Sequence, residues 1–422
     1  MQPLSNKDSL EKYSFLKSKL KAYKDLVDEN LLNEIDILAR QLQNFRVIHY
    51  NTTAKGGGVA AMIKSLLPIM NELGIKHYSK VIHLDNFGCL FMAKLSELIQ
   101  GGGVGELTKA ERDLFVQGLT RSLEPISSDS ADVYWIHDIQ LLPVAQLQID
   151  MRPIVWLNHV DTSRPNQDAE KFVRSYLSDY DMCVYNTPFS AFKSNCNNRF
   201  ETISLGIDVF SNKNREMSLS EGKSVMKNCG IDVSRPVITQ VARFGRFKNP
   251  WQAIDIYRCV KSKMPQVQLV LIGAMEANDD IEADGIYKDI RKYAGDDSDI
   301  HLLSNPEMLG DTQINAFQRF SAAIIQRSTR EGFGLTVTEA MWKKQPVIGT
   351  SAIGFKSQIH HEKNGFIADD IETSAEYVIR LLKDRQLHKR LGLAAKEHVK
   401  RNFLLPIMVK DYLQLLRKVK GV

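Results

Sequence analysis

Two carboxylates, Glu331 and Glu339, stand eight positions apart in the most informative stretch of this chain. An apolar run at residues 322–325 precedes them and predicts a buried strand. The order of strand, glycine-containing turn and helix places Glu331 at a helix start, beside unpaired backbone N–H groups. Glu339 then follows about two turns along the helix. One carboxylate can hydrogen-bond a sugar hydroxyl while the other binds a second group roughly a nucleotide's width away.

A glycine-rich loop at residues 51–60 follows a predicted strand and precedes a predicted helix at residues 61–73. Its glycines, Gly56, Gly57 and Gly58, let backbone amides approach a ligand closely, and a helix start favours negative charge. A diphosphate suits such a loop. The spacing is not that of a dinucleotide fingerprint, and a tight structural turn would explain the same residues.

A cationic turn follows the predicted strand at residues 237–241 and contains Arg243, Arg246 and Lys248. Ligands of open α/β sheets bind at the carboxyl ends of the strands. Cations at this place could stabilise the charge that develops on a leaving diphosphate. The alternative is a solvated turn with no ligand.

Polar residues also end two further predicted strands, at residues 133–136 and 154–157, and these residues are His137, Asp138, Gln140, His159 and Asp161. At a cleft they could hydrogen-bond sugar hydroxyls, although a histidine at a strand end is often structural, which is our prediction for His49. Two His and two Asp would admit a metal ion. Because neither an HExxH motif nor a close ligand triplet appears, we predict none.

Short apolar runs alternate with helical stretches along the whole chain, which predicts parallel sheets covered by helices on both faces. Two such series indicate two doubly wound domains, with a boundary in the polar stretch at residues 211–236. The predicted strands are residues 46–50, 81–84, 133–136, 154–157, 182–185, 202–205, 237–241, 267–272, 300–303, 322–325 and 346–348. One or two helices, at residues 10–42, precede the first strand and are predicted to pack as a cap.

Composition bounds the function only loosely. The net charge of +5 over 422 residues does not suggest a nucleic-acid partner. Five scattered cysteines without a CxxC pair predict reduced thiols and a cytoplasmic protein. No apolar run approaches the ~18 residues of a membrane span, and the N-terminus is unlike a secretory signal.

Several stretches together resemble a known family. The loop at 51–60, the polar strand ends at 137–140 and 159–163, and residues 328–337 resemble motifs of the retaining GT-B glycosyltransferases of family four. The whole length is similar to the glycosyltransferring trehalose synthases within that family. The resemblance implies two Rossmann-like, doubly wound domains facing each other across a cleft: residues 1–230 on the acceptor side, residues 231–395 binding the nucleotide sugar, and a helix at residues 396–422 packing back on the first domain.

The function implied is retaining transfer of glucose from a nucleotide diphosphate sugar to an acceptor sugar. UDP-, ADP- or GDP-glucose would be the co-substrate, free glucose the acceptor and trehalose the product, with no metal or other cofactor. Alternatives are a retaining trehalose phosphorylase, a family member with another acceptor, and a non-catalytic binder of sugar nucleotides. A homodimer is compatible with the sequence, which does not determine the assembly.

The resemblance also assigns residues. Arg243 and Lys248 would hold the diphosphate with amides near Gly57 and Gly58, Glu331 would contact the transferred sugar, and Glu339 the ribose. His159 would lie near the donor sugar. The donor-binding set is completed by Gly332, Phe333, Gly334 and Leu335, and the acceptor would be met by His137, Asp138, Gln140 and Asp161.

Overall fold

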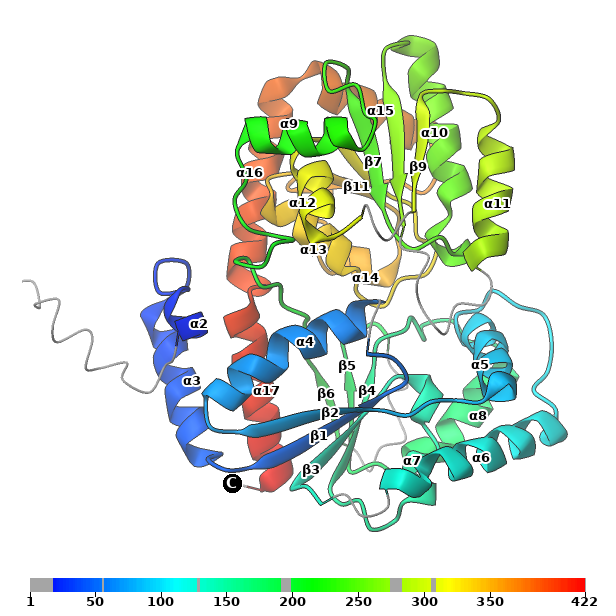
Figure 1. Cartoon of the computed structure of the whole chain (residues 1–422), viewed down its shortest axis with the longest axis vertical. Helices are drawn as coiled ribbons and strands as arrows, with labels where there is room; N and C mark the ends of the chain where they lie inside the picture. The colour runs from blue at the N-terminus through cyan, green and yellow to red at the C-terminus, as the bar shows by residue number, and fades with distance from the viewer. Residues whose placement is uncertain are drawn as a thin grey trace, which may run out of the picture.

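A computed structural model of the chain describes residues 18–54, 57–126, 130–190, 199–273, 283–304 and 309–421. Two six-stranded sheets, in the orders β2-β1-β3-β4-β5-β6 and β12-β11-β10-β7-β8-β9, form two lobes. All the neighbouring strands pair in parallel. Figure 1 shows one lobe above the other, with helices on both faces of each sheet. The prediction of a GT-B arrangement of two Rossmann-like domains is confirmed.

The first lobe contains the strands β1 (Arg46–Asn51), β2 (Lys76–Val81), β3 (Val133–His137), β4 (Ile154–Asn158), β5 (Met182–Tyr185) and β6 (Phe200–Thr202). Its helices are α2 (Ser18–Lys21), α3 (Glu29–Gln41), α4 (Gly57–Glu72), α5 (Asn86–Ile99), α6 (Lys109–Leu123), α7 (Val144–Leu147) and α8 (Gln167–Leu177), with 3-10 turns η1 (Glu124–Ile126) and η2 (Ile139–Leu141).

The second lobe contains β7 (Val237–Val241), β8 (Gln268–Ile272), β9 (Ile300–Leu303), β10 (Ala323–Gln326), β11 (Val347–Gly349) and β12 (Gly365–Ile367). Its helices are α9 (Leu219–Asn228), α10 (Pro250–Lys263), α11 (Ala283–Ala294), α12 (Asp311–Phe320), α13 (Leu335–Trp342), α14 (Ile353–Lys356), α15 (Ile371–Lys383) and α16 (Arg385–Asn402), with the 3-10 turn η3 (Arg246–Lys248). The last helix, α17 (Leu405–Lys420), returns to the first lobe.

The central strands of both sheets are buried along their whole length, because helices cover both faces. Alternate residues of β3 divide between two cores. Trp135 packs with α17 in one core, and Tyr134 and Ile136 pack with α5 and α6 in the other. The predicted strand at 81–84 is wrong by most of its length, since β2 ends at Val81. This strand lies at a sheet edge and is mostly polar, so it lacks the apolar run that marks a central strand.

The C-terminal helix α17 lies beside α3 against the first lobe (Figure 1). Tyr412 stacks on Trp135 with ring centroids 4.6 Å apart, and Gln414 Nε2 donates to Glu34 Oε1 at 2.6 Å. Helix α9, which the prediction assigned to the first domain, instead packs against α12, where Gly222 lies on the ring of Phe320. The exact division at residues 230 and 395 stays a prediction.

Two further expectations concern the whole chain. No helix in the described part is long and apolar enough to cross a membrane. The expectation of five reduced thiols is wrong for Cys183, which is disulfide-bonded, while Cys89, Cys229 and Cys259 are free.

Candidate functional site

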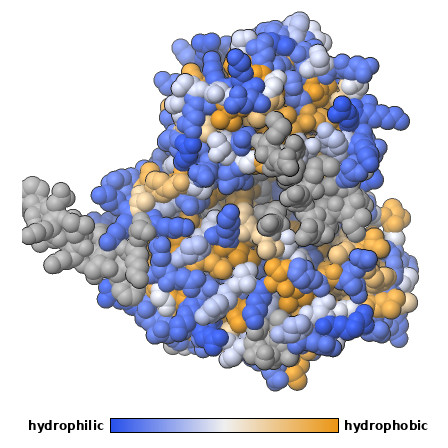
Figure 2. All heavy atoms as spheres, in the orientation of Figure 1, coloured by the Kyte–Doolittle hydropathy of each residue, from blue (hydrophilic) through white to orange (hydrophobic). Residues whose placement is uncertain are grey.

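The two lobes meet where the carboxyl ends of their strands face each other. A Cβ atom added to Gly332, in the loop after β10, would lie 1.9 Å from the carbonyl oxygen of His159, in the loop after β4. Only a glycine permits this approach. Gly58, near the start of α4, faces Leu335 of α13 across the same junction. Figure 2 shows the two lobes from one side, with the second lobe above the first. Residues 55–56 of the predicted glycine loop, which include Gly56, lie outside the described residues.

Glu331 and Lys248 form an ion pair at this junction. Their loops follow β10 and β7, which are neighbours in the sheet, so the two side chains converge. Lys248 Nζ lies 2.6 Å from Glu331 Oε2, and the same oxygen accepts from Ser328 Oγ at 3.2 Å. Glu331 is 16% exposed and Lys248 25% exposed, so both remain within reach of a ligand.

The turn that carries Glu331 differs from the expectation. Helix α13 begins only at Leu335, after Gly334 in the left-handed conformation (φ +87°), so Glu331 lies before the first helical turn and not in it. A side chain at position 334 would also lie 2.7 Å from the ring of Phe355. Glycine is therefore needed here for both its backbone conformation and its size.

Arg327 stands directly after β10, just before this turn, and was missed by sequence reasoning. It is completely buried and directs its guanidinium to the carbonyl oxygens of Ala368 and Asp369 at 2.9 and 3.0 Å and to Gln252 Oε1 at 3.0 Å. Burial lowers the pKa of Arg327 to about 10, against the attraction of Asp369 and Asp370. The signal in the sequence was an arginine placed directly after an apolar strand.

The cationic turn keeps two exposed arginines, Arg243 and Arg246, on the loop after β7. Lys248 stands at the end of this turn, and its carbonyl oxygen accepts from Gln240 Nε2 at 3.0 Å. Asn249 then adopts a left-handed conformation and caps α10 through its side chain. The turn is thus held by β7 and α10, and its positive charges lie on the side of the lobe that carries Glu331.

Glu339 lies deeper, on the second turn of α13, and is 4% exposed. Both carboxylate oxygens have protein partners: Lys213 Nζ at 2.8 Å from Oε1, and Gln318 Nε2 at 3.2 Å from Oε2. Although burial alone would lower it, the charge of Glu339 raises the pKa of Lys213 overall. The contact of Glu339 with a ribose stays a prediction. A bound nucleotide sugar would have to share this carboxylate with Lys213.

A buried lysine, Lys343, directly follows α13 and is 4% exposed. Its Nζ donates to Asn214 Oδ1 at 2.7 Å, Gln318 Oε1 at 2.9 Å and the carbonyl of Glu339 at 3.1 Å. Burial lowers the pKa of Lys343 to about 7, against the attraction of Glu339. Because Lys213 and Asn214 belong to the segment between the two sheets, this cluster ties the interlobe connection to α13.

Asp138, directly after β3 in the first lobe, has a strained backbone with φ +60° and ψ −173°. A residue other than glycine in this region costs about 1–3 kcal/mol and persists only where its surroundings hold it. Here the carbonyl oxygen of Asp138 accepts from Trp156 Nε1 at 2.8 Å, and its Oδ1 accepts from the backbone N–H of His159 at 2.9 Å. The strain presents the carboxylate to the loop of His159.

The two predicted histidines are stacked one behind the other. His137 Nδ1 lies 3.1 Å from His159 Nε2, and His137 Nε2 lies 2.9 Å from Nδ1 of the buried His49. His137 is completely buried, whereas His159 is partly exposed. Both ring nitrogens of His137 are therefore engaged within the protein, and this geometry does not support the expected direct contact of His137 with an acceptor. Burial lowers the pKa of both imidazoles, which favours their neutral forms.

Asp161 links the two lobes. Its Oδ1 accepts from the backbone and hydroxyl of Ser163 at 2.9 and 2.6 Å, and its Oδ2 lies 3.8 Å from Nη1 of Arg330 in the loop after β10. Asp161 is 1% exposed, so in this conformation Arg330 covers it. Gln140 stands half-buried on η2. The roles assigned to these residues remain predictions.

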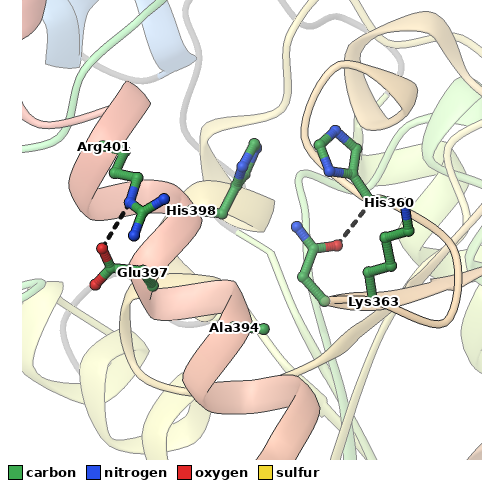
Figure 3. Close-up of a pocket in the computed structure, with 7 residues that line it drawn as sticks. His360, Lys363, Ala394, Glu397, His398 and Arg401 are labelled. Atoms are coloured by element: carbon green, nitrogen blue, oxygen red, sulfur yellow. Dashed lines mark hydrogen bonds and ion pairs between the residues drawn. The ribbon is translucent and has the colours of Figure 1, made fainter.

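A separate hollow of about 240 Å³ lies between α16 and the loop before β12, and none of the predicted residues lines it. Figure 3 shows His360 and His398 on its two sides, with Arg401 turned to Glu397 on the same helix, 2.7 Å away. Ligand pockets usually measure ~300–1,000 Å³, so the hollow is small, and its arginine is already paired. The junction of the lobes is the better candidate. The described residues contain no cluster of three or more His, Cys, Asp or Glu able to hold a metal ion.

Comparison with known proteins agrees with this assignment. Residues 49–191 match the family described as trehalose synthase, N-terminal domain, and residues 223–398 match the glycosyl transferases group 1. A trehalose synthase of Thermococcus litoralis is 35% identical over 398 residues, which cover 94% of this chain and 96% of the relative. The chain belongs to the trehalose synthase family of GT-B glycosyltransferases.

More distant relatives of this glycosyltransferase differ in activity. A trehalose phosphorylase of Pleurotus pulmonarius is 24% identical over 433 residues, covering 90% of this chain and 58% of the fungal protein. A solved structure described as trehalose-6-phosphate from E. coli bound with UDP-2-fluoro glucose shares the fold, with a TM-score of 0.69 and 14% identity over 89% of this chain and 99% of that one. The resemblance to GT-B glycosyltransferases close to trehalose synthase is thus confirmed.

Proposed function

We propose that this glycosyltransferase moves glucose from a nucleotide diphosphate sugar to free glucose, with retention of the anomeric configuration, and so forms trehalose. The observation that carries the proposal is the ion pair of Lys248 and Glu331 at the junction of the lobes, 2.6 Å between Nζ and Oε2 and still partly exposed. The 35% identity to a trehalose synthase over nearly the whole chain supports the choice of reaction.

The donor would lie with its diphosphate near Lys248 and the exposed Arg243. A lysine neutralises phosphate charge as a point charge, and an arginine can bind two phosphate oxygens at once. As the bond between the anomeric carbon and the phosphate oxygen lengthens, negative charge grows on the diphosphate and these cations stabilise it. Glu331 would accept a hydrogen bond from a hydroxyl of the transferred sugar and orient it relative to Lys248.

The acceptor would enter from the first lobe, beside His159 and the loop of Asp138. In the proposed step, an acceptor hydroxyl attacks the anomeric carbon on the face that the diphosphate leaves. The bond from carbon to phosphate oxygen breaks, the bond to the acceptor oxygen forms, and the acceptor proton passes to the leaving phosphate oxygen. Such a step needs positioning and charge stabilisation more than a protein nucleophile. The approach of Gly332 to His159 would bring the two sugars together and exclude water.

The test incubates the full chain with UDP-, ADP- or GDP-glucose, each with and without glucose, in the presence of EDTA. We expect one nucleotide to be released in step with a non-reducing disaccharide, only when glucose is present, and the product to be α,α-trehalose by NMR. Slow nucleotide release without disaccharide would leave the donor proposal standing and reject glucose as the acceptor. No release from any donor would reject the proposed function.

A phosphorylase is the second candidate, because relatives with that activity match 90% of the chain and because Glu339 is already engaged by Lys213. Phosphate would then occupy the diphosphate site and attack the anomeric carbon of one half of trehalose, forming glucose 1-phosphate and releasing the other half as free glucose with the proton of phosphate. Exchanging Glu339 for Ala would leave Lys213 without its hydrogen-bond acceptor, so a loss of folding stability could be mistaken for a loss of binding. Glu339→Gln keeps an acceptor oxygen and is the better variant. A nucleotide-sugar enzyme should lose donor affinity in Glu339→Gln, whereas a phosphorylase should keep its affinity for phosphate.

A further inference from the structure

An unbroken chain of hydrogen bonds runs from the C-terminal helix to the junction of the lobes. Tyr412 OH lies 3.1 Å from His49 Nε2, His49 Nδ1 lies 2.9 Å from His137 Nε2, and His137 Nδ1 lies 3.1 Å from His159 Nε2. His159 Nδ1 then meets Asn186 Oδ1 at 2.7 Å. The chain crosses β1 and β3 and joins α17, at the far end of the sequence, to the loop after β4.

The direction of every hydrogen bond in this chain follows from its end at Asn186. The amide nitrogen of Asn186 donates to the carbonyl of Ile203 at 3.2 Å, which turns Oδ1 toward His159. A carbonyl oxygen only accepts, so His159 carries its hydrogen on Nδ1 and accepts at Nε2. His137 must then donate from Nδ1 and accept at Nε2, and His49 must do the same.

Tyr412 completes the chain at the other end. Its hydroxyl is the donor that the bare Nε2 of His49 requires, and its ring is fixed by stacking on Trp135, 4.6 Å between centroids. Tyr412, His49 and His137 are at most 2% exposed, so no water substitutes easily for a lost partner. The groups that face this chain are the uncharged His77, 5.4 Å from His49, and the carboxylate of Asp138 near His159.

We infer that Tyr412 is a positioning residue for His159, acting through His49 and His137. Asn186 sets the tautomer of the three imidazoles, and Tyr412 supplies the donor that His49 requires at the other end. The two ends together hold the ring of His159, whose backbone carbonyl closely approaches Gly332 in the loop after β10. The seating of α17 against the first sheet is thereby coupled to the geometry at the junction. The link to catalysis rests on the proposed function, whereas the link between Tyr412 and the state of His159 does not.

The experiment compares wild type with Tyr412→Phe, which removes the hydroxyl and keeps the ring. The full chain is labelled with ¹⁵N-histidine, and long-range ¹H–¹⁵N spectra report which ring nitrogen carries the hydrogen. A His159→Gln sample assigns the His159 signals. In wild type we expect His49, His137 and His159 each to carry the hydrogen on Nδ1. In Tyr412→Phe the His159 signals should move, although two histidines separate the two sites. The rate of sugar transfer should fall roughly 5- to 30-fold, as for one lost buried hydrogen bond, with a smaller change in KM for the nucleotide sugar.

Tyr180→Phe is the matched control. Tyr180 is also completely buried in the first lobe, and its hydroxyl donates to the carbonyl of Leu142 at 2.7 Å, outside the chain. It should lower stability by a similar amount and leave the His159 signals in place. Unchanged His159 signals in Tyr412→Phe, or equal movement in Tyr180→Phe, would overturn the inference. Moved signals in a protein without transferase activity would support the inference and reject the proposed function.

Discussion

The ion pair of Lys248 and Glu331 allows a sharp test of the proposed donor site. The change is Lys248→Met, which keeps the length of the side chain and removes its charge. Within the described part of the chain, the carboxylate of Glu331 would then keep only Ser328 Oγ, at 3.2 Å, as a hydrogen-bond donor. The variant thus leaves a carboxylate that is only 16% exposed without its cation.

The stability cost lies between two known limits. Exposed ion pairs contribute about 0–1 kcal/mol, whereas breaking a buried pair costs about 3–5 kcal/mol. With side chains 25% and 16% exposed, this pair should cost about 2 kcal/mol when broken. For a domain of this size, that corresponds to a fall in Tm of about 4–8 °C.

The effect on the donor should be larger than the effect on folding. A hydrogen bond to a charged group contributes about 1.5–3 kcal/mol, so losing the contact of Lys248 with the diphosphate should weaken donor binding roughly 10- to 150-fold. Calorimetric titration with the nucleotide sugar measures the affinity, and thermal unfolding of the same samples measures the stability.

Lys261→Met is the matched control. Lys261 is 30% exposed and pairs with Asp297 and Asp299 at 2.8 and 3.0 Å, on α10 and away from the junction. It should lower Tm and leave donor affinity unchanged. If Lys248→Met and Lys261→Met destabilise the chain alike and both bind the donor as wild type does, Lys248 is a structural residue and the reasoning fails.

Three other predictions concern the junction and its supports. Gly332→Ala should leave each lobe folded but place a methyl group 1.9 Å from the carbonyl oxygen of His159, so X-ray scattering should show a more open molecule. The transfer rate should fall at least tenfold, since misplacement of reacting groups by ~1 Å can cost 10²-fold. Arg327→Lys cannot reproduce three hydrogen bonds with a planar fork and should destabilise the chain by about 2–4 kcal/mol in urea unfolding. Burial lowers the pKa of Lys343 from 10.5 to about 7, so between these pH values the unfolded chain binds more protons than the folded chain. This lysine should therefore make the free energy of unfolding rise with pH, and the rise should disappear in Lys343→Met.

Each of these predictions has a contrary outcome. A Gly332→Ala protein with unchanged scattering and activity would show that the lobes do not need this contact. Arg327→Lys with the stability of wild type would mean that the guanidinium contributes little to the stability of the chain. The same pH slope in wild type and in Lys343→Met, between pH 7 and 10, would assign that slope to other groups.

Sequence reasoning predicted the two-lobed fold because local signals and the global arrangement agree. Buried parallel strands are continuous apolar runs, and such runs mark β3, β4, β7 and β8 directly. The edge strand β2 escaped because most of its residues are polar and only His77 is buried, so it lacks an apolar run. The order of strand, turn and helix around Glu331 was also readable, although the helix begins later, at Leu335.

Pairings between distant residues were not readable. Nothing near Glu339 in the sequence indicates that Lys213, from the segment between the sheets, binds its carboxylate at 2.8 Å. Nothing near Arg327 points to Asp369, 42 positions later, as a hydrogen-bond partner. Such contacts depend on how helices pack on sheets, and packing is decided by shape and burial over the whole lobe.

The histidines show most clearly which features follow from the sequence and which depend on the tertiary structure. Residue types and strand ends alone identified His137 and His159 as polar groups at one sheet edge, because parallel strands bring their carboxyl ends together. Only the tertiary structure decided that His137 is buried behind His159 and that Tyr412, 275 positions after His137, closes the hydrogen-bond chain through His49. The sequence thus determined which chemical groups meet at the junction of the lobes, since strand order and side-chain type are local properties. Folding decided which of those groups face a ligand and which are locked in place, since hydrogen-bond partners and burial arise only when distant segments pack together.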